Sequence, residues 1–280
     1  MNRDELFRLL RCPLDGGEFL SGSGKLQCRT CRYTAPIEDG IVSLLGPEDE
    51  EARRELAIRE QEYRQELPRL RREDLLDMVP TMAALQLSGS EVVLELGAGS
   101  GRYTREIARS SAGVIAVDFS RRGLLQIARA GMDNVLPVQS DIARLGVAPN
   151  AFQRLLSTLT SNLPDRKPLY RLAAAAGGRF VFSTHHYGWN ARFRGVEKTG
   201  RYAGSGIYRH FFTADELRNE AAAFFNHVEV RPIGAVLPGT GRLGLPVERF
   251  SGLLDRLPGV RHFGDLLLGV AERPLSPLPD

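Results

Sequence analysis

The chain has 280 residues, of which 42% are hydrophobic and 25% are charged, and its formal net charge is +3. This length suits one α/β core with a small appendage, and no run of 18 apolar residues, the mark of a membrane span, occurs. The 37 basic and 34 acidic residues are interspersed, so the charge is weak evidence for a nucleic-acid partner. Because the first ten residues lack the apolar core of a signal peptide, we expect a soluble, cytoplasmic protein with no membrane partner.

Residues 1–46 contain all three cysteines and are predicted to form a small β domain. Two residues separate Cys12 from Asp15 and Cys28 from Cys31, and glycine-containing turns lie between the two pairs. Two facing C-x-x-C turns hold zinc in a tetrahedron, and a carboxylate oxygen binds zinc at distances similar to imidazole. Two interpretations stay open: a zinc site made by these four side chains, and a metal-free domain with reduced thiols. A disulfide framework is not expected in a cytosolic chain.

Residues 47–90 are predicted to be a helical linker. The stretch 51–66 places opposite charges four residues apart, which favours a solvated helix. Residues 74–87 predict a second helix that leads into the first strand of a larger domain.

The most informative stretch is 91–104, EVVLELGAGSGRYT. Its apolar run predicts a buried parallel strand with Glu95 at the end, followed by a tight turn and a helix. Such a layout brings backbone N–H groups up against a ligand. The dinucleotide fingerprint needs its third glycine one place later, where this chain has Arg102. The turn itself consists of Gly97, Ala98, Gly99, Ser100 and Gly101.

A carboxylate just before a G-x-G-x-G turn resembles the first motif of class I S-adenosylmethionine (SAM)-dependent methyltransferases. In that family the glycines admit the methionine part of the cofactor and the acid faces its ammonium group, which implies these roles for the turn and for Glu95. The N-terminal domain resembles the small zinc-ribbon-like domain that activates some tRNA methyltransferases, a family in which not every member holds zinc. The resemblance also implies a lid across the cofactor for residues 59–63, although a plain linker helix is an equal alternative.

Two further acids close the next strands. The run 114–117 predicts a strand that ends at Asp118, and an acid about 20 residues beyond such a turn accepts hydrogen bonds from ribose hydroxyls. The strand predicted at 135–138 precedes Asp141 and Ile142. The resemblance implies that this acid binds the adenine amine and that its apolar neighbour packs on the ring, whereas Asp141 taken alone is more typical of a helix N-cap. Phe119 and Ser157 complete the predicted cofactor site.

The remaining elements alternate between strands and helices. Strands are predicted at 152–157, 179–183, 227–231 (ended by Pro232) and 266–271, with helices at 121–130 and 169–176. Thr213 and Glu216 form a capping box for a helix predicted to reach Phe225. This order predicts an α/β fold with a mainly parallel sheet. The resemblance implies a Rossmann-like class I methyltransferase sheet over residues 91–280, mostly parallel with the last strand antiparallel.

Residues 183–187, STHHY, supply the main candidates for catalysis. His185, His186 and Tyr187 follow the fifth strand at the sheet edge where ligands bind, and imidazole titrates near neutral pH. We therefore predict a general base or substrate-orienting group here, with His210 as a further candidate. The competing interpretation is that the histidines only cap the strand or bond backbone.

Two insertions, 188–212 and 234–264, are predicted to build a substrate pocket, because loops of this length tend to be functional. Their aromatic and arginine side chains suit a small molecule, and would also stack RNA bases. The sequence thus predicts a SAM-dependent methyltransferase acting on an oxygen or nitrogen of a small metabolite, in secondary metabolism. The alternatives are a ribosomal or transfer RNA base methyltransferase and a non-catalytic SAM-binding scaffold. The sequence does not predict the oligomeric state.

Overall fold

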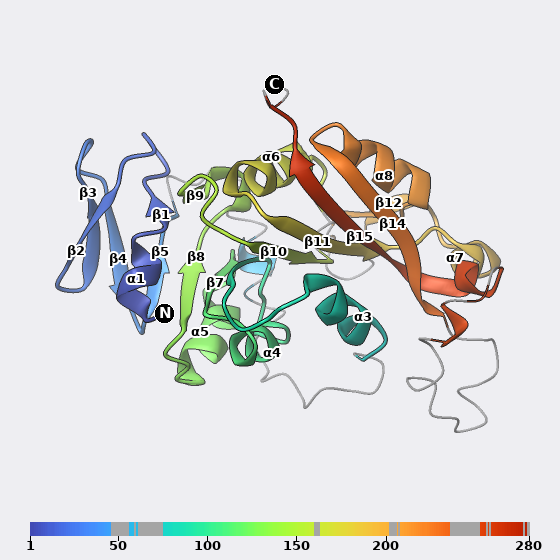
Figure 1. Cartoon of the computed structure of the whole chain (residues 1–280), viewed down its shortest axis with the longest axis horizontal. Helices are drawn as coiled ribbons and strands as arrows, with labels where there is room; N and C mark the ends of the chain where they lie inside the picture. The colour runs from blue at the N-terminus through green and yellow to red at the C-terminus, as the bar shows by residue number, and fades with distance from the viewer. Residues whose placement is uncertain are drawn as a thin grey trace. The chain divides into compact units, whose positions relative to one another are not determined.

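The structure is a computed structural model that describes residues 1–45, 75–159, 163–201, 208–235 and 259–276, together with the short stretches and single positions 56–58, 60, 206, 253–255, 257 and 278. The chain divides into two compact units (Figure 1). Unit 1 comprises Met1–Leu67, Leu87–Ser157 and Lys167–Gly178, and unit 2 comprises Pro68–Gln86, Thr158–Arg166 and Arg179–Asp280. None of the described helices is both long and apolar enough to cross a membrane.

A parallel sheet forms the centre of unit 1. Strand β7 (Gly113–Asp118) pairs with β6 (Val92–Leu96) and with β8 (Val135–Gln139), while β6 pairs on its other side with β10 (Arg154–Thr158). Every residue of β6, β7 and β8 is buried, as expected for strands covered on both faces. Helix α4 (Thr104–Arg109) packs along β7, and α5 (Arg121–Arg129) packs along β7 and β8 (Figure 1). Helix α6 (Lys167–Ala176) belongs to the same unit. The predicted α/β class is confirmed.

The N-terminal residues continue this sheet. Strands β2 (Phe19–Gly22), β3 (Lys25–Cys28) and β4 (Thr34–Glu38) form an antiparallel meander, and β4 pairs with β5 (Ile41–Ser43). Strand β5 then pairs in parallel with β8. Helix α1 (Arg3–Phe7) precedes β1 (Leu10–Arg11), which pairs with β9 (Gly146–Val147). The domain boundaries at 46 and 90 stay predictions, and most of the predicted linker helix, with all of residues 59–63 except Glu60, lies outside the described residues.

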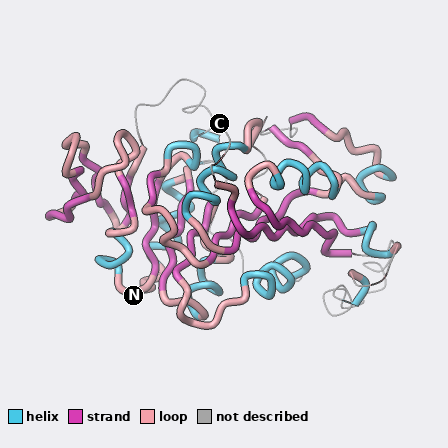
Figure 2. Tube along the Cα trace, turned by 45° about the horizontal axis from the view of Figure 1, so that its top comes forward, coloured by secondary structure: helices cyan, strands magenta, loops and turns pink. Residues whose placement is uncertain are grey.

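Unit 2 contains an antiparallel group of strands. Strand β15 (Gly264–Pro274) pairs antiparallel with β11 (Arg179–His185) and with β14 (Phe225–Ala235). These strands are labelled in Figure 1, and all strands are magenta in Figure 2. The predicted antiparallel last strand is therefore confirmed. Helices α3 (Leu75–Leu85) and α8 (Ala214–Ala222) pack against these strands. The first insertion forms helix α7 (Trp189–Phe193) and the hairpin of β12 (Thr199–Arg201) and β13 (Tyr208–His210), whereas most of the second lies outside the described residues.

Two predicted boundaries in unit 2 are wrong. The capping box of Thr213 and Glu216 is present, but α8 ends at Ala222 because Phe225 joins β14, with its ring centroid 6.2 Å from that of Phe180. Pro232 does not end its strand either. It lies opposite Leu267 in β14, which is the edge strand of the described sheet, and an edge strand tolerates a residue without an N–H.

Candidate functional site

The glycine turn after β6 is held by hydrogen bonds to the end of β7. Gly97, Gly99 and Gly101 have φ angles of 81°, 56° and 86°, in the region that favours glycine. The N–H groups of Gly97 and Ala98 donate to the carbonyl oxygen of Val117 at 2.8 and 2.9 Å. Each glycine therefore serves a conformation that the turn requires.

Asp118 joins the turn to the start of α5. Its Oδ2 accepts from the N–H of Gly99 at 2.7 Å, and its Oδ1 accepts from the N–H of Ser120 at 2.8 Å. The Ser120 hydroxyl caps α5 by accepting from the N–H of Gly123. Asp118 therefore connects the glycine turn with the N-terminus of α5.

Glu95 is a deeply buried acid at the end of β6. It is only 3% exposed, and its Oε2 accepts from the hydroxyl of Thr104 at 2.6 Å. Burial raises the pKa of Glu95 to about 8; the Thr104 hydrogen bond opposes this shift and the nearby Asp118 adds to it. A cation beside Glu95 would favour the ionised form, so this position suits an ammonium group.

The other predicted cofactor residues lie at the same ends of the strands. Ser157 of β10 is buried and stands in register with Leu96 of β6. Asp141 caps the 3₁₀ turn η2 (Ile142–Arg144) by accepting from the N–H of Ala143 at 2.9 Å, which confirms its N-cap role. The carbonyl oxygen of Phe119 accepts from the side chain of Gln139 at 3.1 Å. These residues share the carboxyl edge of β6, β7, β8 and β10, where open α/β sheets bind ligands. Their roles toward a cofactor stay predictions.

Two residues that the sequence motif does not single out also shape the turn. Thr104 binds Glu95, and a Cβ on Gly123 would lie 2.6 Å from the carbonyl oxygen of Gly99. Glycine at position 123 therefore lets α5 approach the turn closely. A glycine in the first turn of a predicted helix, where it weakens the helix, is the available signal for Gly123. Thr104 has no such signal, because its contact with Glu95 depends on the path of the turn.

The strongest catalytic candidates lie in unit 2. His186 is 7% exposed, and its Nδ1 lies 2.8 Å from the carbonyl oxygen of Gly264, so Nδ1 donates and Nε2 is the acceptor of the neutral ring. Burial lowers the pKa of both His185 and His186. A Cβ on Gly188 would come within 2.5 Å of the His186 ring. A neutral imidazole suits a base, and this packing also agrees with a role in binding backbone.

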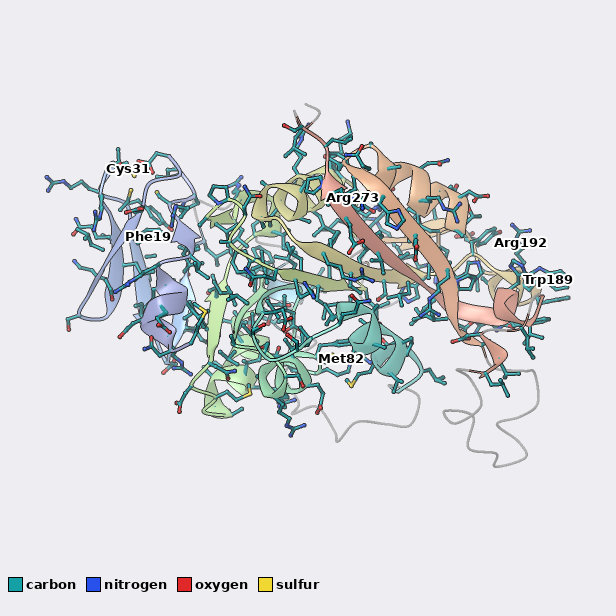
Figure 3. All side chains as sticks on the ribbon, viewed as in Figure 1. Phe19, Cys31, Met82, Trp189, Arg192 and Arg273 are labelled. Carbon is teal, nitrogen blue, oxygen red and sulfur yellow. The ribbon has the colours of Figure 1, made fainter. Side chains whose placement is uncertain are left out.

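The other two candidates lie nearby in the chain. The Nδ1 of His210 lies 2.7 Å from the hydroxyl of Thr199, and burial lowers the pKa of this imidazole. The Tyr187 ring lies 5.3 Å from the guanidinium carbon of Arg192. Helix α7, labelled at Trp189 and Arg192 in Figure 3, exposes 53% of Trp189 and 78% of Phe193. The first insertion therefore does present aromatic side chains to solvent.

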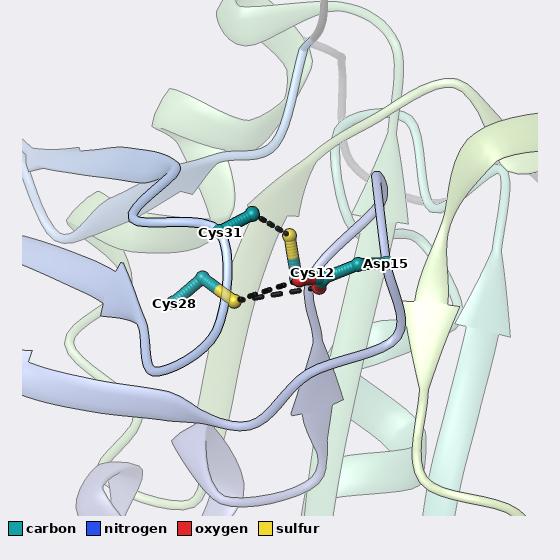
Figure 4. A group of neighbouring side chains, drawn as sticks. All are labelled: Cys12, Asp15, Cys28 and Cys31. Atoms are coloured by element: carbon teal, nitrogen blue, oxygen red, sulfur yellow. Dashed lines mark hydrogen bonds between the residues drawn. The ribbon is translucent and has the colours of Figure 1, made fainter.

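The four predicted metal ligands converge in the N-terminal domain (Figure 4). The ligand atoms of Cys12, Asp15, Cys28 and Cys31 all lie within 4.8 Å of one another. The Sγ atoms of Cys12 and Cys31 are 3.5 Å apart, and Cys28 Sγ is 3.4 Å from Asp15 Oδ1. The N–H of Gly17 orients the carboxylate by donating to Asp15 Oδ1 at 2.9 Å. All three cysteines are free, and three sulfurs with one carboxylate oxygen fit a tetrahedral zinc site.

Residues 93–176 match the family described as Methyltransferase domain. This part of the chain is therefore similar to a methyltransferase domain. A curated relative, the protein-L-isoaspartate O-methyltransferase of Anaeromyxobacter dehalogenans, is 35% identical over 103 residues, which make up 35% of this chain and 48% of the relative. The chain therefore spans about half the length of that relative.

Solved structures share the fold at low sequence identity. A SAM-dependent methyltransferase from Mesorhizobium loti is 22% identical with a TM-score of 0.50, and the match covers 72% of this chain and 98% of that chain. The complex between the Haloferax volcanii Trm112 methyltransferase activator and the putative methyltransferase is 16% identical with a TM-score of 0.54. That match covers 82% of this chain and 100% of the matched chain. The DhpI-SAM-HEP complex is 17% identical with a TM-score of 0.53, and the match covers 81% of this chain and 100% of that chain. These likenesses establish the Rossmann-like methyltransferase fold.

Replacing Glu95 by glutamine tests the buried acid. Because its folded pKa of about 8 exceeds the ordinary glutamate pKa of 4.5, the stability that this group contributes is lost as the pH rises from about 4.5 to about 8. The Glu95→Gln protein should therefore lose less stability than wild type over that interval, while its affinity for SAM falls about tenfold or more. Urea denaturation at a series of pH values and calorimetric titration measure the two effects. Glu106→Gln, which changes a half-buried acid of α4 that pairs with Arg109, is the matched control. An affinity as high as wild type in Glu95→Gln would contradict the assignment.

Proposed function

We propose that this protein transfers a methyl group from SAM to an oxygen or nitrogen atom of a small-molecule metabolite. The observation that carries the proposal is the arrangement around Asp118, which binds the glycine turn through Gly99 and the start of α5 through Ser120. The buried Glu95 stands beside this turn and suits a cationic group. Glu95 would bind the ammonium group of the methionine part of SAM, and Asp118 would bind the hydroxyl groups of its ribose.

Each residue of the site has one role in this proposal. Glu95 and the glycine turn hold the amino-acid end of the cofactor, and Asp118 holds the ribose. Asp141, Ile142 and Phe119 surround the adenine, with Ser157 at the neighbouring strand end. SAM, when bound, supplies a methyl group on a positively charged sulfur. Positioning contributes much of the rate of such a displacement, and a base is needed only when the acceptor has a proton to lose.

The proposal that the substrate is a small molecule rests on the charge of the chain. A net charge of +3 with interspersed signs gives little attraction to a polyanion, since RNA binding depends on concentrated basic surface. A role in secondary metabolism and a cytoplasmic location belong to the same proposal and rest on the sequence alone. RNA methylation and non-catalytic SAM binding are outcomes of the test below.

Transfer of tritiated methyl groups from SAM, offered in parallel to a small-molecule extract and to bulk RNA, tests this function. We expect label in the small-molecule fraction with wild-type protein and none with Asp118→Ala, whose dissociation constant for SAM should rise about tenfold or more. Asp133→Ala, an exposed acid in the same unit, is the control. Label in RNA that ribonuclease removes would establish the RNA alternative. Tight SAM binding without transfer to either fraction would support the scaffold.

We also propose that His185 or His186 acts as the base or orients the acceptor. The His185→Ala and His186→Ala proteins should then lose more than about tenfold in turnover while SAM affinity stays within about threefold of wild type. His227→Ala, an exposed histidine of β14, controls for the loss of an imidazole elsewhere in unit 2. Wild-type turnover in both variants would remove these histidines from the mechanism.

We further propose that Cys12, Asp15, Cys28 and Cys31 bind structural zinc. Their convergence within 4.8 Å supports this assignment. Elemental analysis of protein produced with zinc should give about one zinc per chain, lost in Cys28→Ser and retained in Glu18→Gln, which changes an exposed acid of the same domain. Chelation should lower the melting temperature of wild type. Wild-type protein free of zinc and insensitive to chelation would establish the metal-free alternative.

A further inference from the structure

The first turn of α5 is positively charged, although the N-terminus of a helix favours negative charge. The helix begins with Arg121 and Arg122 and has no acidic residue in its first turn. Because the partial charge at a helix N-terminus is positive, cations there are unfavourable and acids are stabilising. This helix also follows directly on Asp118, so its start belongs to the candidate cofactor site.

Three acids from the N-terminal part of the chain supply the missing charge, and one of them, Glu38, has its Oε2 3.4 Å from Arg121 Nη2. Asp39, in the turn between β4 and β5, accepts through Oδ2 from Arg121 Nη2 at 2.9 Å. Its φ of 53° is unusual for a residue other than glycine. Glu60 accepts through Oε1 from the hydroxyl of Ser120 at 3.0 Å and from the N–H of Arg122 at 3.2 Å. Its Oε2 lies 3.4 Å from Arg122 Nε.

These contacts continue to the glycine turn through shared groups. The residue whose hydroxyl binds Glu60 is Ser120, and the N–H of the same residue donates to Asp118. Asp118 in turn binds the N–H of Gly99. The path from Glu60 to the turn therefore passes through two side chains, both of them buried.

A third N-terminal contact reaches the same loop from β8. Ser43 of β5 lies within 3.5 Å of Gln139 Oε1, and Gln139 Nε2 donates to the carbonyl oxygen of Phe119 at 3.1 Å. Of the residues before β6, Glu60 thus contacts the loop 119–120 directly, whereas Ser43 reaches it through Gln139 of β8.

We propose that Glu60 and Asp39 are positioning residues of the cofactor site. By completing the N-terminus of α5 they fix Ser120 and Asp118, and through Asp118 they fix the glycine turn. Arg121 and Arg122, unfavourable in an isolated helix, act as the attachment points for these acids. The inference rests on the proposed function, because it assigns further residues to the same site. By linkage, cofactor binding stabilises the contacts of Glu60 and Asp39 to the same extent.

Charge reversal with compensation tests this inference. The variants are Glu60→Arg, Arg122→Glu and the protein with both changes, and the measurement is calorimetric binding of S-adenosylhomocysteine. Glu60→Arg should raise the dissociation constant about tenfold, because it places a third cation at the helix start. The double variant should recover about threefold of that loss, because the opposite charges face each other again while the acceptor for the Ser120 hydroxyl is not restored. The same cycle with Asp39→Arg and Arg121→Asp is an independent check.

The control is Asp215→Arg, which breaks an exposed ion pair with Arg218 on α8 and should leave binding unchanged. If Glu60→Arg does not fold, Glu60→Gln keeps the size of the side chain and should raise the dissociation constant about threefold. Unchanged binding in both Glu60 and Asp39 variants, or a double variant no better than its parents, would overturn the inference and leave the proposed function intact. Wild-type protein that binds no S-adenosylhomocysteine would overturn the proposed function, and this inference with it.

Discussion

The carboxylate of Asp118 is the constraint on which the candidate cofactor site depends. One oxygen binds the N–H of Gly99 and the other binds the N–H of Ser120, so a single side chain fixes a glycine turn and a helix start relative to β7. Glycines at positive φ would otherwise allow the turn many conformations. Because the carboxylate is almost fully buried, its hydrogen bonds are little weakened by competing water. The turn is therefore shaped before a ligand arrives, which lowers the entropy cost of binding.

In the function that we propose, the burial of Glu95 lowers stability but favours binding of a cation. A carboxyl group buried at the end of β6 is costly to ionise, and its raised pKa of about 8 expresses that cost. The same burial makes the ionised form a strong partner for a cation, because few water molecules compete. A residue that is unfavourable for the folded chain by itself is thus useful once a positively charged ligand is present. Strained or destabilised groups of this kind are expected at functional sites.

The N-terminal residues contact both the central sheet and the start of α5. Strand β5 extends the core sheet beside β8, and Asp39 and Glu60 offset the positive charge of Arg121 and Arg122 at the start of α5. The sequence suggests an appended domain and a solvated linker, because local patterns do not reveal which strand a short β segment will join. Pairing partners depend on long-range contacts, and the same is true of the capping of one segment by an acid some sixty residues away.

The sequence by itself determined the alternation of strands and helices from β6 to β11, the apolar runs of the buried strands and the strand-end positions of Glu95, Asp118 and Asp141. Those features follow from local periodicity and from the requirement that a parallel strand be buried on both faces. The sequence also identified the four side chains that converge in the N-terminal domain, because the spacing of two residues within each pair predicts a metal-binding turn. These are Cys12, Asp15, Cys28 and Cys31. Only the tertiary structure decided that Thr104 binds Glu95, that Gly123 admits the glycine turn, that Pro232 lies within an edge strand and that N-terminal acids complete α5. Each of these contacts joins residues that folding brings together from separate segments, and a local sequence pattern does not predict such contacts.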